Sequence, residues 1–163
     1  MLALHPDSLK IEKICGDFNS RTFTSDLDKK DYELVLSSSA LQWSSDLNFT
    51  IGKIATLSNT LHAAVFTSNT FKTLHETARV TSPIYSAEEV QQSIERYYDD
   101  VDFELHTYRL EFGSVREMFR YIKKSGVSSG EKKLNYKETK MLMKKYPLDH
   151  LEFEVLFVEA KNM

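Results

Sequence analysis

The sequence contains little glycine, proline or cysteine, with five, three and one of these residues in 163. The glycines are scattered, at positions 16, 52, 113, 126 and 130, and neither G-x-G-x-x-G nor G-x-x-x-x-G-K occurs. A glycine-rich loop that cradles a phosphate is therefore excluded within this chain. The single cysteine, Cys15, excludes an internal disulfide and suits a reducing compartment.

The side-chain patterns of metal sites and serine nucleophiles are also missing. The histidines do not have the spacing of zinc ligands; they are His5, His62, His75, His106 and His150. A serine nucleophile needs a G-x-S-x-G elbow or a comparable context, which the run of serines at 37–39 lacks. We therefore expect no metal and no serine hydrolase chemistry.

Long apolar runs and strong charge bias are absent as well. No run of 18 apolar residues occurs, and the opening MLALHPDSLK lacks the basic region, apolar core and cleavage signal of a secretory peptide, so we expect a cytoplasmic protein. The net charge of −3 argues against a surface that wraps nucleic acid. With 41% hydrophobic and 28% charged residues, the 163-residue chain fits one folded domain.

The stretch DYELVLSSSALQW, residues 31–43, carries the clearest signal of a site. Residues 32–36 predict a short buried strand, and the serines at 37–39 predict its carboxyl-end turn. Ligands of open α/β sheets bind just outside such strand ends. Serine is equally a preferred helix N-cap, so a binding and a capping interpretation both remain open. Trp43, which follows Gln42 after the turn, fits either a pocket wall or the core.

The rest of the pattern predicts alternating strands and helices. Expected strands cover residues 9–15, 32–36, 60–67, 103–112 and 151–160, and expected helices cover residues 46–57, 70–80, 86–98, 114–124 and 136–146. The second and third strands should form a parallel crossover unit, and the last two an antiparallel hairpin interrupted by a helical pair. The final strand has the alternation of an edge strand, and a flexible basic loop is expected at 128–133.

Two further positions attract attention because of their neighbours. Asp17 stands between Gly16 and Phe18 after the first expected strand, where a carboxylate can accept a hydrogen bond from an exocyclic amine. Aspartate is also a common turn residue, so this position alone decides nothing. Arg79 precedes the loop VTSPIYS, whereas the other arginines fit solvated helix and strand positions.

Six segments together carry a family resemblance. They are CGDF (15–18), ELVLSSSALQW (33–43), VFTSNTFKTLHE (65–76), PIYSAEEVQQSI (83–94), FRYIKKSGV (119–127) and LEFEVLFVEAKN (151–162). In this order and at nearly this spacing they resemble the class I S-adenosylmethionine-dependent methyltransferases, and among these the malonyl-[acyl-carrier-protein] O-methyltransferases of biotin synthesis. The resemblance covers essentially all 163 residues as a single partial domain. It implies a Rossmann-like α/β fold truncated at its N-terminus, because the family's glycine-loop strand and second strand have no counterpart here.

The resemblance also implies a site for the cofactor S-adenosylmethionine. Asp17 would accept the adenine amino group, and the backbone of Phe18 would meet the adenine ring. Ser37 and Ser38 would line the methionine end of the cofactor. No catalytic residue is implied, because displacement at a sulfonium methyl by a carboxylate requires alignment and exclusion of water rather than a general base.

The implied methyl acceptor is the free carboxylate of a malonyl thioester on acyl carrier protein. The implied lid over it consists of residues 70–85 and the helical pair before the last strand, so that residues from about 70 to 150 hold the lid helices and the hairpin insert. Substrate contacts would come from Gln42, Trp43, Arg79 and Tyr85. A cation is the expected partner of the carboxylate. The family usually carries an arginine close to the position of Pro83, whereas Arg79 lies about one helical turn earlier, which is a departure from the pattern.

The missing strands have two expected consequences. A class I sheet places its first strand beside residues 32–36, so its absence leaves unpaired strand edges and exposed apolar surface. We therefore expect weak cofactor binding and self-association through the exposed edge. The alternative is a non-catalytic interaction module that binds acyl carrier protein or a complementary N-terminal fragment.

Overall fold

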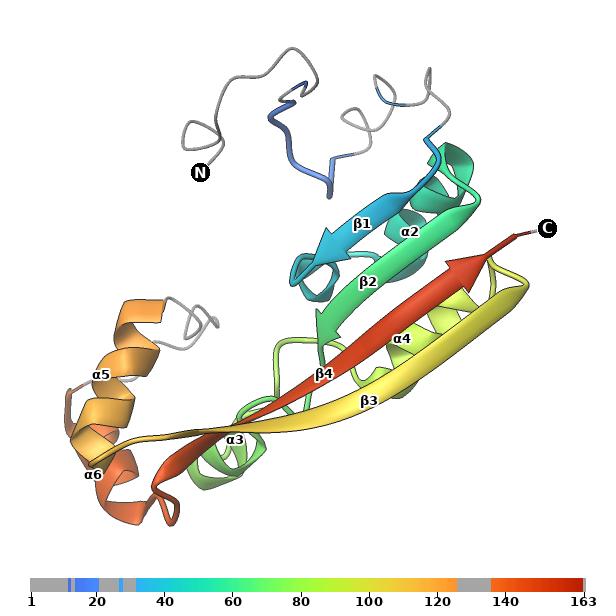
Figure 1. Cartoon of the computed structure of the whole chain (residues 1–163). Coiled ribbons are helices and arrows are strands. Elements are labelled where there is room, and N and C mark those ends of the chain that lie inside the picture. The colour runs from blue at the N-terminus through green and yellow to red at the C-terminus, as the bar shows by residue number, and fades with distance from the viewer. Residues whose placement is uncertain (1–11, 13, 21–26, 28–31, 126–135, 163) are drawn as a thin grey trace.

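A computed structural model describes residues 12, 14–20, 27, 32–125 and 136–162 of the chain. It consists of one four-stranded sheet with helices packed along it (Figure 1). The elements run in the order β1 (Val35–Ser38), η2 (Leu41–Trp43), α2 (Leu47–Leu57), β2 (Thr60–Phe66), α3 (Lys72–Ala78), α4 (Ala87–Ile94), β3 (Asp100–Glu111), α5 (Val115–Ser125), α6 (Tyr136–Lys145) and β4 (His150–Lys161).

The strands lie in the order β1-β2-β4-β3 across the sheet. β1 and β2 are parallel, with Val35 opposite Leu61, and the helix α2 connects them. β4 runs antiparallel to both of its neighbours, and α5 and α6 interrupt the β3–β4 hairpin. The expected α/β class, the parallel crossover unit and the interrupted hairpin are therefore confirmed.

The expectation that the final strand lies at an edge is wrong. β4 is an inner strand, paired with β2 on one side and β3 on the other. Its alternation has a different cause: Val158 and Ala160 are buried against helices, while Phe157 and Glu159 point to the other face and are exposed. A strand covered on one face alternates in the same way whether or not it has two neighbours.

The two expected N-terminal strands also differ from the structure. Glu12, Ile14 and Cys15 are not in a strand, and the remainder of that segment lies outside the described residues, as does the loop expected at 128–133. The next strand begins at Val35 rather than at residue 32. Leu36 is 73% exposed rather than buried, because β1 is an edge strand with one uncovered face. The helix expected to reach residue 98 ends at Ile94.

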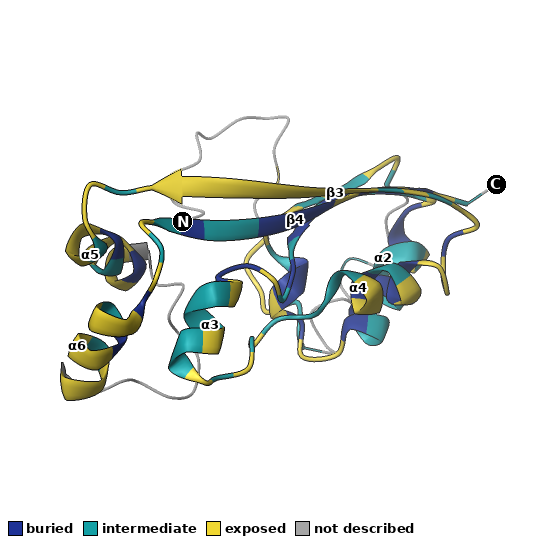
Figure 2. Cartoon of the chain, turned by 90° about the horizontal axis from the view of Figure 1, so that it is seen from below, coloured by how far each residue is buried: buried dark blue, intermediate teal, exposed yellow. Residues whose placement is uncertain are grey.

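The larger core lies between the sheet and the helices α2 and α4, which pack on the same face (Figure 2). Ile51 of α2 and Ile94 of α4 are fully buried against Leu61, Val65 and Leu156 of the sheet. Two caps hold these helices in place: Asp46 accepts a hydrogen bond from the backbone N–H of Phe49, and Ser86 forms a capping box with Glu89.

A second core closes the far end of the β3–β4 hairpin. Met118 and Ile122 of α5 pack there with Tyr146 and Leu151, and Phe71 joins them from the N-terminal end of α3. Burial raises the pKa of Tyr146 to about 12, with a smaller contribution from the negative charge of Glu152. Within the described part of the chain, none of the helices has the length and apolarity that crossing a membrane requires.

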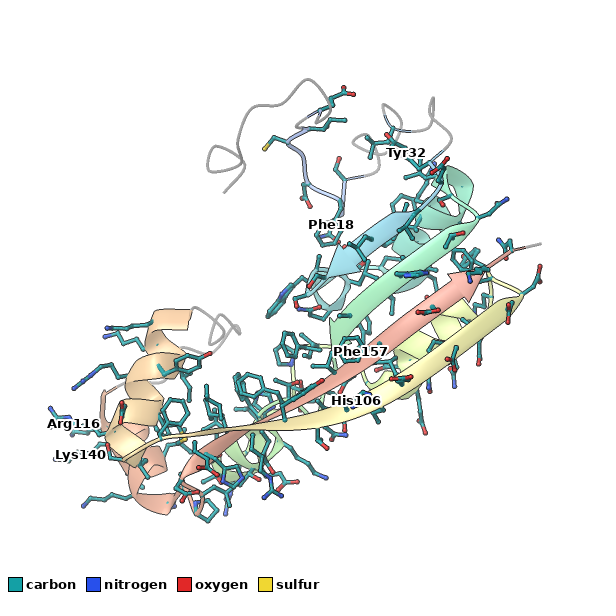
Figure 3. All side chains as sticks on the ribbon, in the orientation of Figure 1. Phe18, Tyr32, His106, Arg116, Lys140 and Phe157 are labelled. Carbon is teal, nitrogen blue, oxygen red and sulfur yellow. The ribbon has the colours of Figure 1, made fainter. Side chains whose placement is uncertain are left out.

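The opposite face of the sheet is open among the described elements. Figures 1 and 3 show this face toward the viewer, with His106 and Phe157 on it and the helices α2 and α4 behind it. The rings of His106 and Phe157 meet edge to face at 5.6 Å, and Phe157 is nevertheless exposed. Leu36 lies on the same face at the edge strand β1, in the cross-strand row of His62 and Glu159, so this face combines exposed apolar side chains, charged side chains and a strand edge. Such a surface favours association with another polypeptide.

This open face generates a prediction about self-association. The wild-type chain should form oligomers as its concentration rises, and Leu36→Arg should shift it toward monomer, because the new charge stands beside the edge of β1. The substitution should change the free energy of unfolding by less than about 0.5 kcal/mol, since the side chain it replaces is 73% exposed. Sedimentation velocity at several concentrations, with urea unfolding in parallel, measures both.

Leu105→Arg is the matched control. Leu105 is also an exposed leucine, at 52%, but it lies on β3 at the other edge of the sheet. A wild-type chain that stays monomeric at every concentration would contradict the prediction, as would equal effects of the two substitutions.

Candidate functional site

The candidate site lies where the two parallel strands end. β1 and β2 point the same way, so their carboxyl ends meet at one edge of the sheet, the position at which open α/β sheets bind ligands. Beyond β1, Ser39 turns the chain with a left-handed backbone (φ 57°), and its N–H donates a hydrogen bond to the carbonyl oxygen of Ala64 at 2.8 Å. The strand therefore ends in a fixed turn rather than a loose loop.

The buried side chain of Gln42 stabilises this turn. Its Nε2 donates a hydrogen bond to the carbonyl oxygen of Ser39 at 2.8 Å, and the side chain is only 4% exposed. Its Oε1 is buried and has no hydrogen-bond partner among the residues that the structure describes. Trp43, by contrast, is 44% exposed, so its indole does not belong to the core.

Asn19 ties the segment that contains Asp17 and Phe18 to the loop after β1. Its Oδ1 accepts hydrogen bonds from the backbone N–H of Ser45 at 2.7 Å and from the Ser45 hydroxyl at 3.1 Å. Its Nδ2 donates to the carbonyl oxygen of Trp43 at 3.4 Å. The Asp17 carboxylate accepts the N–H of Asn19 at 2.9 Å, which closes an Asx turn. Phe18 immediately precedes Asn19, so these hydrogen bonds keep it near the loop after β1.

Asn19 is a site residue that sequence reasoning missed. The Asp-x-Asn spacing was a signal for the local turn, since both side chains commonly hydrogen-bond to nearby backbone. The partners of Asn19 are about 25 residues away along the chain, and no local pattern identifies them.

Glu154 fixes the turn that follows β2. Its side chain is buried, and its carboxylate accepts hydrogen bonds from the Thr67 hydroxyl and from Asn69 Nδ2, the latter at 3.0 Å. The Thr70 hydroxyl donates to the Glu154 carbonyl oxygen at 3.0 Å. The inner strand β4 thereby holds the turn at residues 67–70 in one conformation.

A groove, which we call the Ser45 groove, lies between the residues that follow η2 and the loop that precedes α4, with Ser68 of the turn after β2 at its side. Its main pocket has a volume of about 570 Å³ and is lined by Ser44, Ser45, Ser68, Thr81, Ser82, Pro83, Ile84, Tyr85 and Glu89. A second pocket of about 350 Å³ shares Ser45, Tyr85 and Glu89 with it and adds Asp46, Leu47, Asn48, Gln92, Ser93 and Arg96. The Tyr85 hydroxyl donates to the carbonyl oxygen of Ser44 at 2.9 Å, so the loop before α4 is attached to the loop after β1.

The charge of the main pocket comes from one carboxylate. Glu89 is the only described lining residue there that is charged at neutral pH. Ser86 lowers the pKa of Glu89 by donating its backbone N–H at 2.7 Å and its hydroxyl at 2.8 Å. Among the described residues, no group of three or more histidine, cysteine or acidic side chains is arranged to hold a metal ion.

The structure brings some of the expected site residues together and leaves others apart. Tyr85 lines the groove, and Asp17 and Phe18 approach it through the contact between Asn19 and Ser45. Ser37 and Ser38 end β1, and Gln42 lies buried behind the turn. Arg79 is exposed at the C-terminal end of α3 and lines neither pocket. The roles assigned to these residues stay predictions.

Comparison with known proteins supports the fold. No family model matches the chain, and no curated protein matches its sequence. Among solved structures, it is similar to a protein of Bacillus halodurans C-125 provisionally assigned as a methyltransferase, with a TM-score of 0.55 and 13% identity over 94% of this chain and 78% of that one. It is also similar to the YcgJ protein of Bacillus subtilis, with a TM-score of 0.53 and 10% identity over 82% of this chain and 65% of that one. The chain therefore has the Rossmann-like fold of methyltransferases.

The Glu154 contacts generate a prediction about stability. Glu154→Ala should lower the free energy of unfolding by about 1–3 kcal/mol, because it leaves the fully buried Thr67 hydroxyl without its acceptor. Glu154→Gln should cost less, since its amide oxygen still accepts. Urea unfolding measures both. Glu159→Ala, on the exposed face of the same strand, is the control and should change stability by under about 0.5 kcal/mol; equal losses at the two positions would contradict the prediction.

The Asn19 contacts generate a prediction about local order. Asn19→Ala should shift the backbone amide resonances of Ser45 and Phe18 in ¹⁵N-resolved NMR spectra, because the link between their segments is lost. Overall stability should fall by no more than about 1 kcal/mol, since these hydrogen bonds are exposed to water. Asn19→Asp keeps the acceptor for Ser45 and should leave the Ser45 resonance near its original position. Unchanged spectra in Asn19→Ala would show that the link does not order this segment.

Proposed function

We propose that this chain is a methyltransferase domain that uses S-adenosylmethionine. The observation that carries the proposal is the link from Asn19 to Trp43 and Ser45, which brings Asp17 and Phe18 to the carboxyl edge of the parallel strands. The sheet that presents this edge has the fold of methyltransferases. A recognition segment for adenine and a strand-end turn for the methionine end then stand side by side.

The residues present suit this cofactor. The Oδ1 atom of Asp17 closes the turn with Asn19, and its exposed carboxylate retains Oδ2 to accept the amino group of adenine. Ser37 and Ser38, at the end of β1, are small and let a ligand approach the backbone closely. When bound, the cofactor supplies an electrophilic methyl group on sulfur. The contribution of the chain is to bind and orient the donor and acceptor and to limit the access of water.

Methylation of a malonyl carboxylate on acyl carrier protein, in biotin synthesis, stays a prediction from the resemblance. A carboxylate acceptor calls for a cation, and the main pocket of the Ser45 groove offers none among its lining residues. Arg79, the residue expected to serve, lines neither pocket. The proposal therefore specifies the cofactor and the reaction type and leaves the carrier protein as an expected partner.

A second candidate function is that of a non-catalytic interaction module. The observation that favours it is the open sheet face around Phe157, together with the outer edge of β1 at Leu36, which no described strand pairs with. A complementary polypeptide would pair with that edge and cover that face. Binding of S-adenosylmethionine separates this function from the first.

Isothermal titration calorimetry of the 163-residue chain with S-adenosylmethionine tests the proposal. We expect weak, saturable binding to one site, reduced about tenfold in Asp17→Ala, because a hydrogen bond to a charged acceptor is lost. Asp102→Ala, which removes an exposed carboxylate from β3, should bind like the wild type. Absence of binding, or equal affinity in all three proteins, would overturn the proposal and favour the interaction module.

A further inference from the structure

The main pocket of the Ser45 groove is polar and carries a single charge. Ser45, Ser68, Thr81 and Ser82 supply small hydroxyl side chains, and among the described residues no lysine, arginine or histidine lines the pocket. The phenol of Tyr85 is engaged with the Ser44 carbonyl oxygen and is not free to bind an anion. The Ser82 hydroxyl oxygen is buried behind this wall and has no hydrogen-bond partner in the described part of the chain.

The Glu89 carboxylate has one oxygen left for a ligand. Its Oε2 accepts both hydrogen bonds from Ser86, which leaves Oε1 without an assigned partner. Because the same two hydrogen bonds lower its pKa, the group stays ionised at neutral pH. The capping box fixes its position on the first turn of α4. A fixed carboxylate with an open oxygen is a receptor for an N–H donor that carries positive charge.

The partial positive charges at the helix N-termini that face the groove do not outweigh its negative charge. α2 and α4 each contribute about half a positive charge at their first turn. Asp46 already occupies the first of these ends, and Glu88 and Glu89 occupy the second. Arg96 lines only the second pocket, where Asp46 and Glu89 oppose it. The described residues of the groove therefore present more negative than positive charge.

We propose that the methyl acceptor bound in the Ser45 groove carries an ammonium group held by Glu89, and that acceptors whose only charge is a carboxylate are disfavoured. This inference rests on the proposed function, because only a methyltransferase binds a methyl acceptor. The groove adjoins the cofactor segment through the contact between Ser45 and Asn19. The ammonium group is a binding determinant. It anchors one end of the molecule, and the methylated atom lies elsewhere on it.

Two four-carbon probes of opposite charge test the proposal: 1,4-diaminobutane and succinate. Each is titrated into the ¹⁵N-labelled 163-residue chain at low ionic strength, where screening is weak. We expect the diamine to shift the amide resonances of Ser45, Ser68 and Thr81 saturably, and succinate to leave them unchanged. Glu89→Gln should weaken diamine binding about two- to five-fold, the range of an exposed ion pair.

Two features of the chain make this test specific. Glutamine is an accepted capping-box residue, so Glu89→Gln removes the charge and keeps the helix start. Glu88→Gln makes the same change on the same turn of α4, but Glu88 lines neither pocket. The affinity of this variant for the diamine should therefore stay near that of the wild type. Equal weakening by both substitutions would mean attraction to the acidic helix end alone and would overturn the proposal.

The remaining outcomes separate this inference from the proposed function. Succinate bound in the groove at least as tightly as the diamine would overturn the inference, as would a diamine that shifts none of the three resonances. S-adenosylmethionine is titrated into the same sample. If S-adenosylmethionine binds and succinate also occupies the groove, the proposed function stands and the inference about the ammonium group fails. If only the diamine binds, the groove is an amine site and the proposed function fails.

Discussion

The parallel pairing of β1 with β2 is the constraint on which the candidate site depends. It brings two strand ends to one edge of the sheet, so that the turn at Ser39 and the turn at residues 67–70 lie on the same side. Two residues distant in sequence then hold these turns: Asn19 contacts the loop after β1, and Glu154 contacts the turn after β2. If β1 and β2 were antiparallel, these two contacts would lie at opposite ends of the strands rather than at one edge of the sheet.

Glu154 and Glu89 show how the environment assigns different roles to the same side chain. The carboxylate of Glu154 is buried and surrounded by donors from Thr67 and Asn69, so its bonding capacity is used within the fold. Glu89 is exposed and uses one oxygen for the helix cap. A buried, saturated carboxylate stabilises structure, whereas an exposed one with an open oxygen is available to a ligand.

The sequence predicted those features whose causes are local. The helix that starts after residue 46, the helix that starts after residue 86 and the alternation along β4 all depend on residues within a few positions of one another. The inner position of β4 was missed because alternation reports how one face is covered and not the number of neighbouring strands. Asn19 was missed for a similar reason, since its partners come from another segment.

The edge strand β1 connects the groove with the open face of the sheet. Its carboxyl end carries Ser37, Ser38 and the turn at Ser39, while its outer edge and the Leu36 side chain are uncovered among the described residues. Because hydrogen bonds with Ala64 and Gln42 already fix the turn at Ser39, a ligand at the strand end and a polypeptide at the outer edge would bind separate surfaces of one preformed strand. We therefore expect the two to bind independently, since neither shifts β1 between two conformations.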